Sequence, residues 1–289
     1  MSASWDNAFA PKDETKDAVL IGLLGAGIKE SRTPRMHMSE AKALGLNCDY
    51  RLIDTDDVEL PLEVDPLLTR LNQIGYAGIN VTFPYKQSVM TYLDTISESA
   101  QKVGAVNTVL FRDGKRIGEN TDSWGFSESM SVGLPDAPKT TVLLIGAGGA
   151  GAAVGAALIK SGAASLLIHD KDTERATALA ARLGTAAEVV SDLVTACAEA
   201  DGIINATPVG MAKLPGMPLP AELIEARHWV GDVVYFPLET ELLACARNKG
   251  CQILSGAGMA LYQAVRAFEL FTGKKPDVKR MWNAFQASG

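Results

Sequence analysis

The chain has 289 residues, a length that favours two domains over one. Hydrophobic residues make up 47% of it and charged residues 21%, which is typical of a folded globular protein and argues against intrinsic disorder. The formal net charge is −7 and no block of Lys and Arg is present, so we expect no nucleic-acid partner.

The cysteines and histidines predict no metal site. The four cysteines lie far apart and form no CxxC pair, and the three histidines form no HExxH motif. A chain of this length can bury a core without disulfides, so we expect reduced thiols and a cytoplasmic location. The residues concerned are Cys48, Cys197, Cys245, Cys251, His37, His169 and His228.

Two segments bear on targeting and membranes. Met1–Asp17 is polar and lacks the basic and apolar regions of a signal peptide, so we expect a loose tail. Thr140–Ile159 carries no charge, but its glycines divide it into a β-branched half and an alanine-rich half. A buried strand followed by a buried helix explains this better than a membrane span, and we expect no membrane partner.

The first half of the chain alternates strands with helices, which predicts a mostly parallel sheet. In the first helix, Thr33 is expected to be the N-cap, with Pro34 at the first helical position and Gly45 just after the end. The expected elements are strands at Val19–Leu24, Cys48–Ile53, Gly78–Thr82, Val106–Phe111 and Lys115–Gly118, a hairpin turn at Asp113-Gly114, and helices at Thr33–Leu44, Asp65–Ile74 and Trp124–Val132.

Leu134–Pro138 interrupts this pattern and is a candidate domain boundary. Beyond it the alternation of strands and helices restarts. The expected elements are strands at Thr141–Ile145, Ser165–His169, Gly202–Asn205 and Val230–Tyr235, and helices at Ala150–Lys160, Asp172–Leu183 and Ala260–Phe271.

A glycine-rich loop in the second half predicts a dinucleotide-binding domain. Gly146–Gly151 (GAGGAG) has GxGxxG spacing and lies between an expected strand and an alanine-rich helix. In that context the backbone N–H groups at the helix start bind a pyrophosphate. The alternative is a glycine turn without a ligand. The cofactor-binding loop residues would be Gly146, Ala147, Gly148, Gly149 and Ala150.

Asp170 ends the next expected strand, about 20 residues beyond the loop. A carboxylate there binds the ribose hydroxyls and repels a 2′-phosphate, which favours NAD over NADP. Two alternatives stay open: Asp170 or Asp172 caps the next helix, or Lys171 or Arg175 accommodates a 2′-phosphate. Arg175 could instead stack on adenine.

A second glycine cluster, Gly22–Gly27, follows the first expected strand. It lacks the GxGxxG spacing, and no acidic residue clearly ends the following strand at the expected place. We therefore interpret it as a loop shaped for a different ligand.

Four polar segments of the first half lie at strand ends, where α/β proteins bind ligands. Lys86 is expected to open a helix after Pro84, a position where the helix dipole lowers a lysine pKa and suits proton transfer. Capping, turn or surface roles are the alternatives. The segments are Ser31–Pro34 (SRTP), Asn80–Lys86 (NVTFPYK), Ala105–Thr108 (AVNT) and Asn120–Asp122 (NTD).

Together with motifs in the second half, these segments resemble the shikimate/quinate dehydrogenase family from about Leu20 to Gly273. The further motifs are Gly146–Ala150 (GAGGA), Asn205–Met211 (NATPVGM), Val233–Pro237 (VVYFP) and Gly258–Gln263 (GMALYQ). The resemblance implies two α/β domains with a cleft between them. We expect a tail at 1–17, a substrate-binding domain at 18–124 completed by helices at 260–289, and a Rossmann NAD-binding domain at 125–259.

The resemblance also implies roles for single residues. Lys86 would be the catalytic base, paired with Asp122, and would take the substrate hydroxyl proton as hydride leaves for nicotinamide C4. Ser31 and Thr33 would hold the substrate carboxylate. The remaining substrate ligands would be Thr82, Asn107, Tyr235 and Gln263, and the cofactor ligands beyond the glycine loop would be Asp170, Arg175 and backbone groups of Val233 and Gly256.

Two departures from the family pattern refine this expectation. Thr33 stands where biosynthetic shikimate enzymes usually have a second serine, and Ser-x-Thr resembles members that also accept quinate. His169–Lys171 (HDK) stands where NADP-dependent members resemble Asn-Arg-Thr. We expect a catabolic, NAD-linked quinate/shikimate dehydrogenase, as a monomer or homodimer. The alternatives are a biosynthetic NADP-dependent shikimate dehydrogenase and a catalytically idle binding protein of the same fold.

Overall fold

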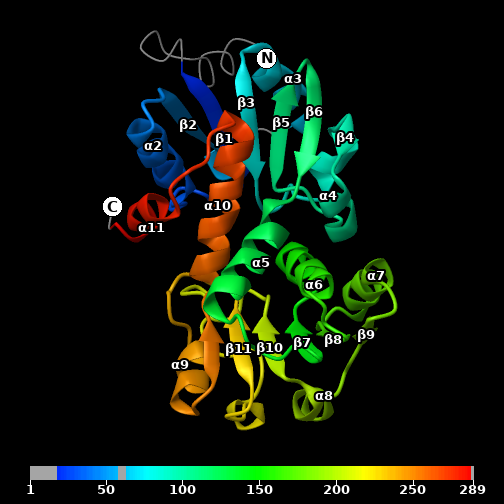
Figure 1. Cartoon of the computed structure of the whole chain (residues 1–289). Coiled ribbons are helices and arrows are strands. Elements are labelled where there is room, and N and C mark those ends of the chain that lie inside the picture. The colour runs from blue at the N-terminus through cyan, green and yellow to red at the C-terminus, as the bar shows by residue number, and fades with distance from the viewer. Residues whose placement is uncertain (1–17, 58–62, 288–289) are drawn as a thin grey trace. The chain divides into compact units, whose positions relative to one another are not determined.

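The computed structural model describes residues 18–57 and 63–287, so the expected tail at 1–17 lies outside it. By their contacts the described residues fall into two units (Figure 1). Unit 1 contains the chain up to Gln101, Ala105–Thr121 and the chain from Ala264, and unit 2 contains Lys102–Gly104 and Asp122–Gln263. The break at Leu134–Pro138 therefore lies inside unit 2.

The described part of unit 1 contains a six-stranded sheet in the order β2-β1-β3-β5-β6-β4. Strands β1, β2 and β3 are parallel, whereas β5 runs antiparallel to both β3 and β6. The carboxyl ends of β1 and β3 therefore lie side by side. The strands are β1 (Val19–Gly25), β2 (Cys48–Asp54), β3 (Tyr76–Val81), β4 (Thr95–Ile96), β5 (Thr108–Arg112) and β6 (Lys115–Glu119).

Each face of this sheet has its own apolar core. One core joins β1 and β3 to the buried leucines of α3, to Val89 of η3 and to Ala100 of α4. The other joins β1 and β5 to Ala267 and Phe271 of α10. The elements are η2 (Thr55–Asp57), α3 (Val64–Gln73), η3 (Ser88–Tyr92), α4 (Glu98–Val103) and α10 (Gly256–Thr272).

The last described helix, α11 (Val278–Gln286), is tied to the first, α2 (Thr33–Ala43). The fully buried Glu40 accepts two hydrogen bonds from the Arg280 guanidinium, at 2.7 and 2.9 Å, and one from the backbone N–H of Asp277. Arg32 and Arg35 donate to the carbonyl oxygen of Phe285 at 3.0 and 3.2 Å. These contacts hold the start of α2 in place.

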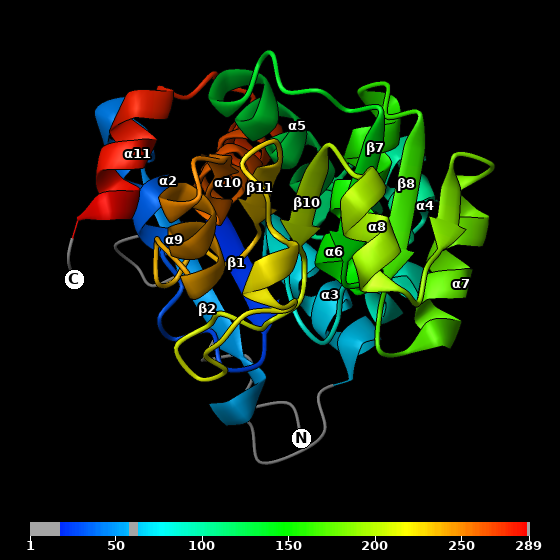
Figure 2. The same cartoon turned by 90° about the horizontal axis from the view of Figure 1, so that it is seen from below.

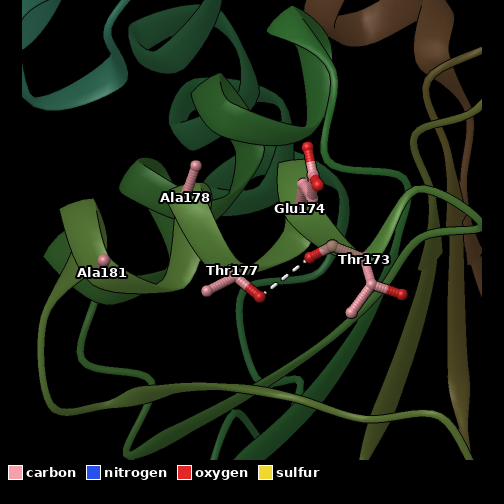
Figure 3. A pocket seen from close by; sticks show the side chains of 5 residues that line it. All are labelled: Thr173, Glu174, Thr177, Ala178 and Ala181. Carbon is pink, nitrogen blue, oxygen red and sulfur yellow. Dashed lines mark hydrogen bonds between the residues drawn. The ribbon is translucent and has the colours of Figure 1, made fainter.

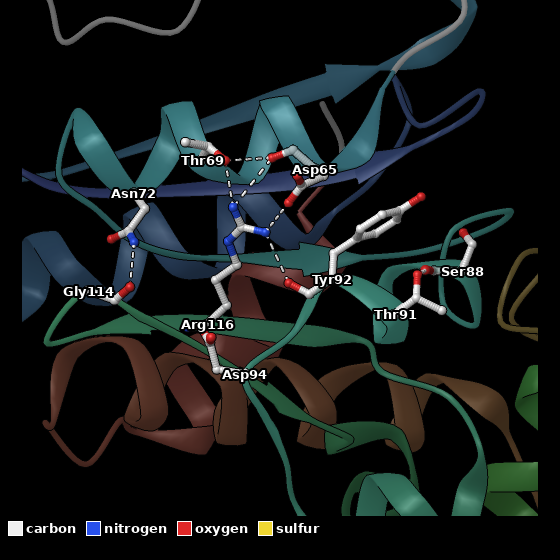
Figure 4. Close-up of polar contacts among 9 residues, drawn as sticks. All are labelled: Asp65, Thr69, Asn72, Ser88, Thr91, Tyr92, Asp94, Gly114 and Arg116. Carbon is white, nitrogen blue, oxygen red and sulfur yellow. Dashed lines mark hydrogen bonds and ion pairs between the residues drawn. The ribbon is translucent and has the colours of Figure 1, made fainter.

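The segment that follows β3 is held by Arg116 of β6 (Figure 4). The guanidinium pairs with the Asp65 carboxylate and donates to Thr69 Oγ1 at 2.6 Å, both on α3. It also donates to the Tyr92 carbonyl oxygen at 3.0 Å, at the end of η3. Arg116 thus fixes the far end of the segment that contains Lys86.

The described part of unit 2 contains a six-stranded, all-parallel sheet in the order β12-β11-β10-β7-β8-β9 (Figure 1). The chain reverses its direction of winding between β7 and β10, which is where open α/β sheets bind ligands. The strands are β7 (Thr141–Ile145), β8 (Ser165–His169), β9 (Ala187–Val189), β10 (Gly202–Asn205), β11 (Trp229–Asp232) and β12 (Gln252–Leu254).

Helices cover both faces of the unit 2 sheet. One face carries α8 (Leu193–Glu199), η4 (Ala221–Leu223) and α9 (Glu241–Asn248); α8 and α9 are labelled in Figure 2. Apolar side chains of these three elements join those of the strands in one core. The other carries α6 (Gly149–Lys160) and α7 (Thr173–Leu183). A Cβ on Gly155 of α6 would lie within 3.4 Å of Leu183, Leu166 and Leu144, so glycine lets α6 pack closely on the strands.

Helix α5 (Thr121–Gly133) crosses the first part of α10 within unit 2. A Cβ on Gly125 would lie 2.6 Å from the backbone nitrogen of Gln263, and one on Gly258 would lie 2.1 Å from Ser129 Oγ. The two glycines therefore allow this close crossing. It places Asp122, one turn before Gly125, on a helix that contacts the segment bearing Gln263.

The structure confirms most of the expected elements and corrects several details. Both residues of the Asp113-Gly114 turn have positive φ, at 50° and 75°, as the hairpin requires. Thr33 is the first helical residue of α2 and Arg32 the N-cap, not Thr33. Asp122 lies inside the first turn of α5, not before it. β11 ends at Asp232, so Val233–Tyr235 is not a strand.

Within residues 18–57 and 63–287, no helix is long and apolar enough to cross a membrane.

Candidate active site

The loop after β7 has the geometry of a pyrophosphate cradle. Gly146 has φ 107°, and a Cβ on Gly151 would lie 1.9 Å from the Gly146 carbonyl oxygen, so glycine is required at both positions. Gly148 is the N-cap of the 12-residue helix α6, with no side-chain cap and no acidic residue in the first turn. A Cβ on Gly148 would meet nothing within 4 Å. The N–H groups at this helix start are thus available to an anion, which fits a dinucleotide.

Asp170 holds the same loop from the end of β8. Its carboxylate accepts the backbone N–H of Ala147 at 2.6 Å and that of Asp172 at 2.9 Å. Asp172, not Asp170, is the N-cap of α7 and also pairs with the exposed guanidinium of Arg175 at 3.0 Å. The capping alternative therefore applies to Asp172 alone.

Val233 and Gly256 lie together in unit 2. The Val233 N–H donates to the Asn205 carbonyl oxygen at 2.9 Å. A Cβ on Gly256 would lie 2.4 Å from the Val233 carbonyl oxygen, so only glycine fits there. Tyr235 lies two residues after Val233, and 38% of its surface is exposed.

A shallow hollow on the outer face of α7 carries none of the expected site residues (Figure 3). Its five lining residues all come from that helix: Thr173, Glu174, Thr177, Ala178 and Ala181. One helix face with one carboxylate offers no set of convergent polar groups, and we assign it no role in the chemistry.

In unit 1 the glycine loop after β1 is held by Asp54, which sequence reasoning missed. Asp54 ends β2 and accepts the N–H groups of Gly27 and Ile28, both at 2.9 Å. Burial raises the pKa of Asp54, but the backbone donors at Asp56, Ile28 and Gly27 outweigh it, so the pKa lies below its usual value. The expectation that no acidic residue ends this strand is wrong.

The same loop supports the segment after β3. A Cβ on Gly25 would lie 2.3 Å from Thr82 Cγ2, and the Ala26 N–H donates to the Phe83 carbonyl oxygen at 3.0 Å. Ser31 and Thr33 follow the loop, and Ser31 Oγ accepts the Thr33 N–H at 3.4 Å. Both side chains are partly exposed. Ser31, Thr33 and Thr82 are thus all carried by this loop or packed on it.

The helix expected to begin at Lys86 does not form. Residues 83–87 are turns, and the five-residue 3₁₀ helix η3 begins only at Ser88. So short an element has little dipole, and the dipole argument for Lys86 fails. The backbone is fixed nonetheless, because the Val106 N–H donates to the Lys86 carbonyl oxygen at 2.8 Å. This bond places Lys86 beside the start of β5.

Asn107 is only 3% exposed and fixes the start of α5. Its Oδ1 accepts the Thr121 N–H at 2.7 Å, and its Nδ2 donates to Thr121 Oγ1 at 2.9 Å. The chain of buried bonds continues from Thr108 through Asn80 to the Tyr50 hydroxyl. Asn107 thus fixes the position of Thr121, the residue that precedes Asp122. The sequence did not predict that Asn80 and Tyr50 belong to this network of hydrogen bonds.

Asp122 and Gln263 belong to unit 2, whereas Lys86 belongs to unit 1. The Asp122 side chain is buried, with 7% of its surface exposed. Gln263 Nε2 donates to the Ala260 carbonyl oxygen at 3.0 Å within its own helix.

A buried polar cluster beside Val233 was also missed. Asp232, at the end of β11, accepts hydrogen bonds from Thr240 Oγ1, the Val234 N–H and Asn205 Nδ2. Burial raises the pKa of this carboxyl to about 6, although the three donors act in the opposite direction. The signal that could have found it is the polar residue at the end of each of two neighbouring buried strands.

Among the described residues, no group of three or more His, Cys, Asp or Glu side chains could hold a metal ion. A glycine loop at the start of a helix, an aspartate at the end of the next parallel strand and a second α/β unit with polar strand ends define a dinucleotide-binding α/β protein.

Comparison with known proteins identifies the family. Residues 23–109 match the shikimate dehydrogenase substrate binding domain, residues 130–212 match shikimate/quinate 5-dehydrogenase, and residues 256–284 match the shikimate 5′-dehydrogenase C-terminal domain. The chain belongs to the shikimate/quinate dehydrogenase family and is an oxidoreductase. Its N-terminal domain is the substrate-binding one and its C-terminal domain binds the nucleotide.

Similar proteins carry both cofactor names. A shikimate dehydrogenase (NADP⁺) of Streptomyces avermitilis is 50% identical, over 92% of this chain and 94% of its own. A quinate/shikimate dehydrogenase (NAD⁺) of Corynebacterium efficiens is 46% identical, over 93% and 98%. The structure of quinate dehydrogenase from Corynebacterium glutamicum in complex with NAD has a TM-score of 0.90 and 45% identity, over 93% and 98%.

Proposed function

We propose that this enzyme oxidises shikimate, quinate or both to the 3-dehydro acid, reversibly, with NAD as the hydride acceptor. The observation that carries the cofactor choice is the Asp170 carboxylate, bonded to the Ala147 N–H at 2.6 Å. This hydrogen bond supports the proposal that the carboxylate lies beside the loop that would bind the pyrophosphate. There it would accept hydrogen bonds from the adenosine ribose and repel a 2′-phosphate.

The acid would be held by convergent polar groups of the polar strand ends. Ser31 and Thr33 are proposed to bind the carboxylate, where their partly exposed hydroxyls offer two donors. The ring hydroxyls are assigned to Thr82, Asn107 and Gln263, and Tyr235 is proposed to approach the substrate from the nucleotide side. A polyhydroxylated acid satisfies such groups, whereas a substrate lacking a hydroxyl leaves one of them unpaired, so this arrangement supports strong selection.

Lys86 and Asp122 are proposed as the catalytic pair. Lys86 Nζ would take the proton from the reacting hydroxyl as the carbon–hydrogen bond breaks, and Asp122 would orient the lysine side chain and bind a substrate hydroxyl. NAD, when bound, supplies the hydride acceptor at nicotinamide C4. Reaction requires that the acid held by the first domain and the nicotinamide held by the second meet.

The rest of the cofactor would be bound by the loop Gly146–Ala150, by Arg175, and by backbone groups of Val233 and Gly256. The start of α6 at Gly148 supports this because it has no side-chain cap. Arg175 pairs with Asp172 and is 69% exposed along its side chain, so its guanidinium is accessible for stacking on adenine. We also expect a cytoplasmic location and a monomer or homodimer.

A biosynthetic, NADP-dependent shikimate dehydrogenase is the second candidate. The exposed Arg175 favours it, since a guanidinium can bind a 2′-phosphate, and the relative from Streptomyces avermitilis carries that name. Asp170 opposes it, because a carboxylate near the 2′-phosphate is repulsive.

Initial rates at 340 nm on four combinations test the proposal: quinate or shikimate, each with NAD or NADP. We expect turnover with NAD, on both acids. Turnover confined to shikimate with NADP would assign the second candidate. No turnover in any combination would overturn the enzyme proposal and favour an idle binding protein.

A further inference from the structure

Asp232 is a buried carboxylate whose hydrogen-bond donors are all neutral. It is 4% exposed and accepts bonds from Thr240 Oγ1 at 2.7 Å, the Val234 N–H at 2.9 Å and Asn205 Nδ2 at 3.0 Å. Burying a charge without a cation is costly. Protonation is correspondingly favoured, and the pKa is raised to about 6 by burial. The presence of such a carboxyl is better explained by the geometry that it imposes on its neighbours than by a contribution to the stability of the fold.

Asn205 extends this cluster into a second loop. Its Nδ2 also donates to the Val209 carbonyl oxygen at 2.8 Å. Its Oδ1 accepts both the N–H of Thr207, at 3.0 Å, and the hydroxyl of Thr207, at 2.7 Å. The amide therefore orders residues 206–210 after β10 while it bonds the carboxylate at the end of β11. One polar cluster joins the loops that come after two neighbouring strands.

Thr240 closes the cluster from a third element. Besides its bond to Asp232, Thr240 Oγ1 accepts the Leu243 N–H at 3.3 Å and so caps α9. Gly210, with φ 103°, lies close by, and a Cβ there would lie 3.4 Å from the Thr240 side chain. The loop after β11 is thus held at its start by Asp232 and beyond its end by the cap of α9.

The segment held in this way is Val233–Tyr235. Val233 bonds to the Asn205 carbonyl oxygen, and its own carbonyl oxygen lies against Gly256. We propose that Asp232, Asn205 and Thr240 are positioning residues that hold the Val233–Tyr235 backbone where it receives the nicotinamide half of the cofactor. This inference rests on the proposed function, which assigns Val233 and Gly256 to the nicotinamide.

The test compares NAD with ADP-ribose, which has the same adenosine and pyrophosphate but no nicotinamide. Thr240→Val removes the hydroxyl donor, and we expect the dissociation constant for NAD to rise about tenfold relative to that for ADP-ribose. Thr240→Ser keeps the hydroxyl and should restore the wild-type ratio. Calorimetric titration gives both constants, and a thermal melt of each variant verifies that it is folded.

Thr195→Val is the matched control. Thr195 Oγ1, like Thr240 Oγ1, donates to a carboxylate in unit 2, that of Asp192 at 2.6 Å, which caps α8. We expect it to leave the ratio unchanged. Equal weakening of NAD and ADP-ribose by Thr240→Val, or no change in either, would overturn the inference. Tight binding of NAD and ADP-ribose without turnover of any acid would instead overturn the proposed function. In that case the ratio of the two dissociation constants would still test whether Thr240 positions the Val233–Tyr235 segment.

Discussion

A glycine-rich loop follows β1 in the first unit and β7 in the second, and each is held by an aspartate from the neighbouring parallel strand. Asp54 accepts the N–H groups of Gly27 and Ile28, while Asp170 accepts that of Ala147. Each carboxylate also accepts the N–H two residues further along its own chain, at Asp56 and Asp172. The local design is the same, so glycine content alone does not distinguish the loops.

The two loops differ in the element that each one leads into. After Gly148 a 12-residue helix begins at once, with an uncapped start that suits an anion. After Gly27 the chain runs on to Ser31 before α2 begins at Thr33, and two N–H groups of the loop are already bonded to Asp54. The first loop therefore supports neighbouring side chains, such as Thr82, whereas the second would present its backbone to a ligand.

The largest expected effect is on the chemical step, which is assigned to Lys86 in unit 1, and not on cofactor binding, which is assigned to unit 2. Lys86→Ala should lower kcat by about 10²- to 10⁴-fold, since it removes the proposed proton acceptor. The dissociation constant for NAD should change less than about twofold, because the cofactor loop is in the other unit. Lys115→Ala, at an exposed lysine of the hairpin, is the control. Retained turnover by Lys86→Ala would refute the role of Lys86.

A second prediction contrasts two strand-end carboxyls. Burial raises the pKa of Asp232 to about 6 from its ordinary 3.8. The folded state therefore holds this proton more tightly, and the stability it contributes is lost as pH rises from about 4 to about 6. This difference between the folded and the ordinary pKa corresponds to about 3 kcal/mol. Asp232→Asn should lack this loss, as denaturant melts across that pH range would show.

Asp54 should behave in the opposite way. Its pKa is lowered, because backbone donors outweigh burial, so its stabilising contribution is present above its ordinary pKa and is lost as pH falls. As the pH falls, the free energy of unfolding should therefore decrease less in Asp54→Asn than in the wild type. Parallel stability curves for the wild type and Asp232→Asn, or for the wild type and Asp54→Asn, would contradict the contrast.

A third prediction sharpens the comparison of the loops themselves. Gly148 has φ −74° and open space at its Cβ position, so Gly148→Ala should fold normally but raise the KM for NAD about tenfold by crowding the pyrophosphate. Gly25→Ala should instead destabilise the fold and raise the KM for the acid, because its Cβ would meet Thr82. Steady-state kinetics together with melting curves test both variants. A higher KM for the acid in Gly148→Ala and a higher KM for NAD in Gly25→Ala would contradict the roles assigned to the two loops.

Much of the nucleotide domain could be predicted because its signals are local. β7, β8 and β10 have the expected bounds, since each is built around consecutive apolar residues that are buried on both faces of the sheet. The short strands β9 and β12 went unpredicted, because three residues cannot show a period. The glycine loop and Asp170 could also be recognised, as a motif with fixed spacing.

The roles of Asp54 and of the Tyr50–Asn80 pair could not be predicted, because each depends on a partner 26 to 30 residues away. A strand-end aspartate shows its function only when the neighbouring strand is known. The expected helix at Lys86 failed for a different reason: residues 83–87, which include Pro84, are turns, and only five 3₁₀ residues come after them.

The smallest expected effect is also the most direct test, because it concerns the cofactor that the second loop selects. The measurement is the ratio of kcat/KM for NAD to kcat/KM for NADP, in the wild type and in Asp170→Ala. Asp170 holds the Ala147 N–H, so some loss with both cofactors is expected, and the ratio isolates the ribose. We predict that the wild type favours NAD and that Asp170→Ala lowers the ratio severalfold. An unchanged ratio would contradict the assignment of Asp170 as the residue that selects NAD.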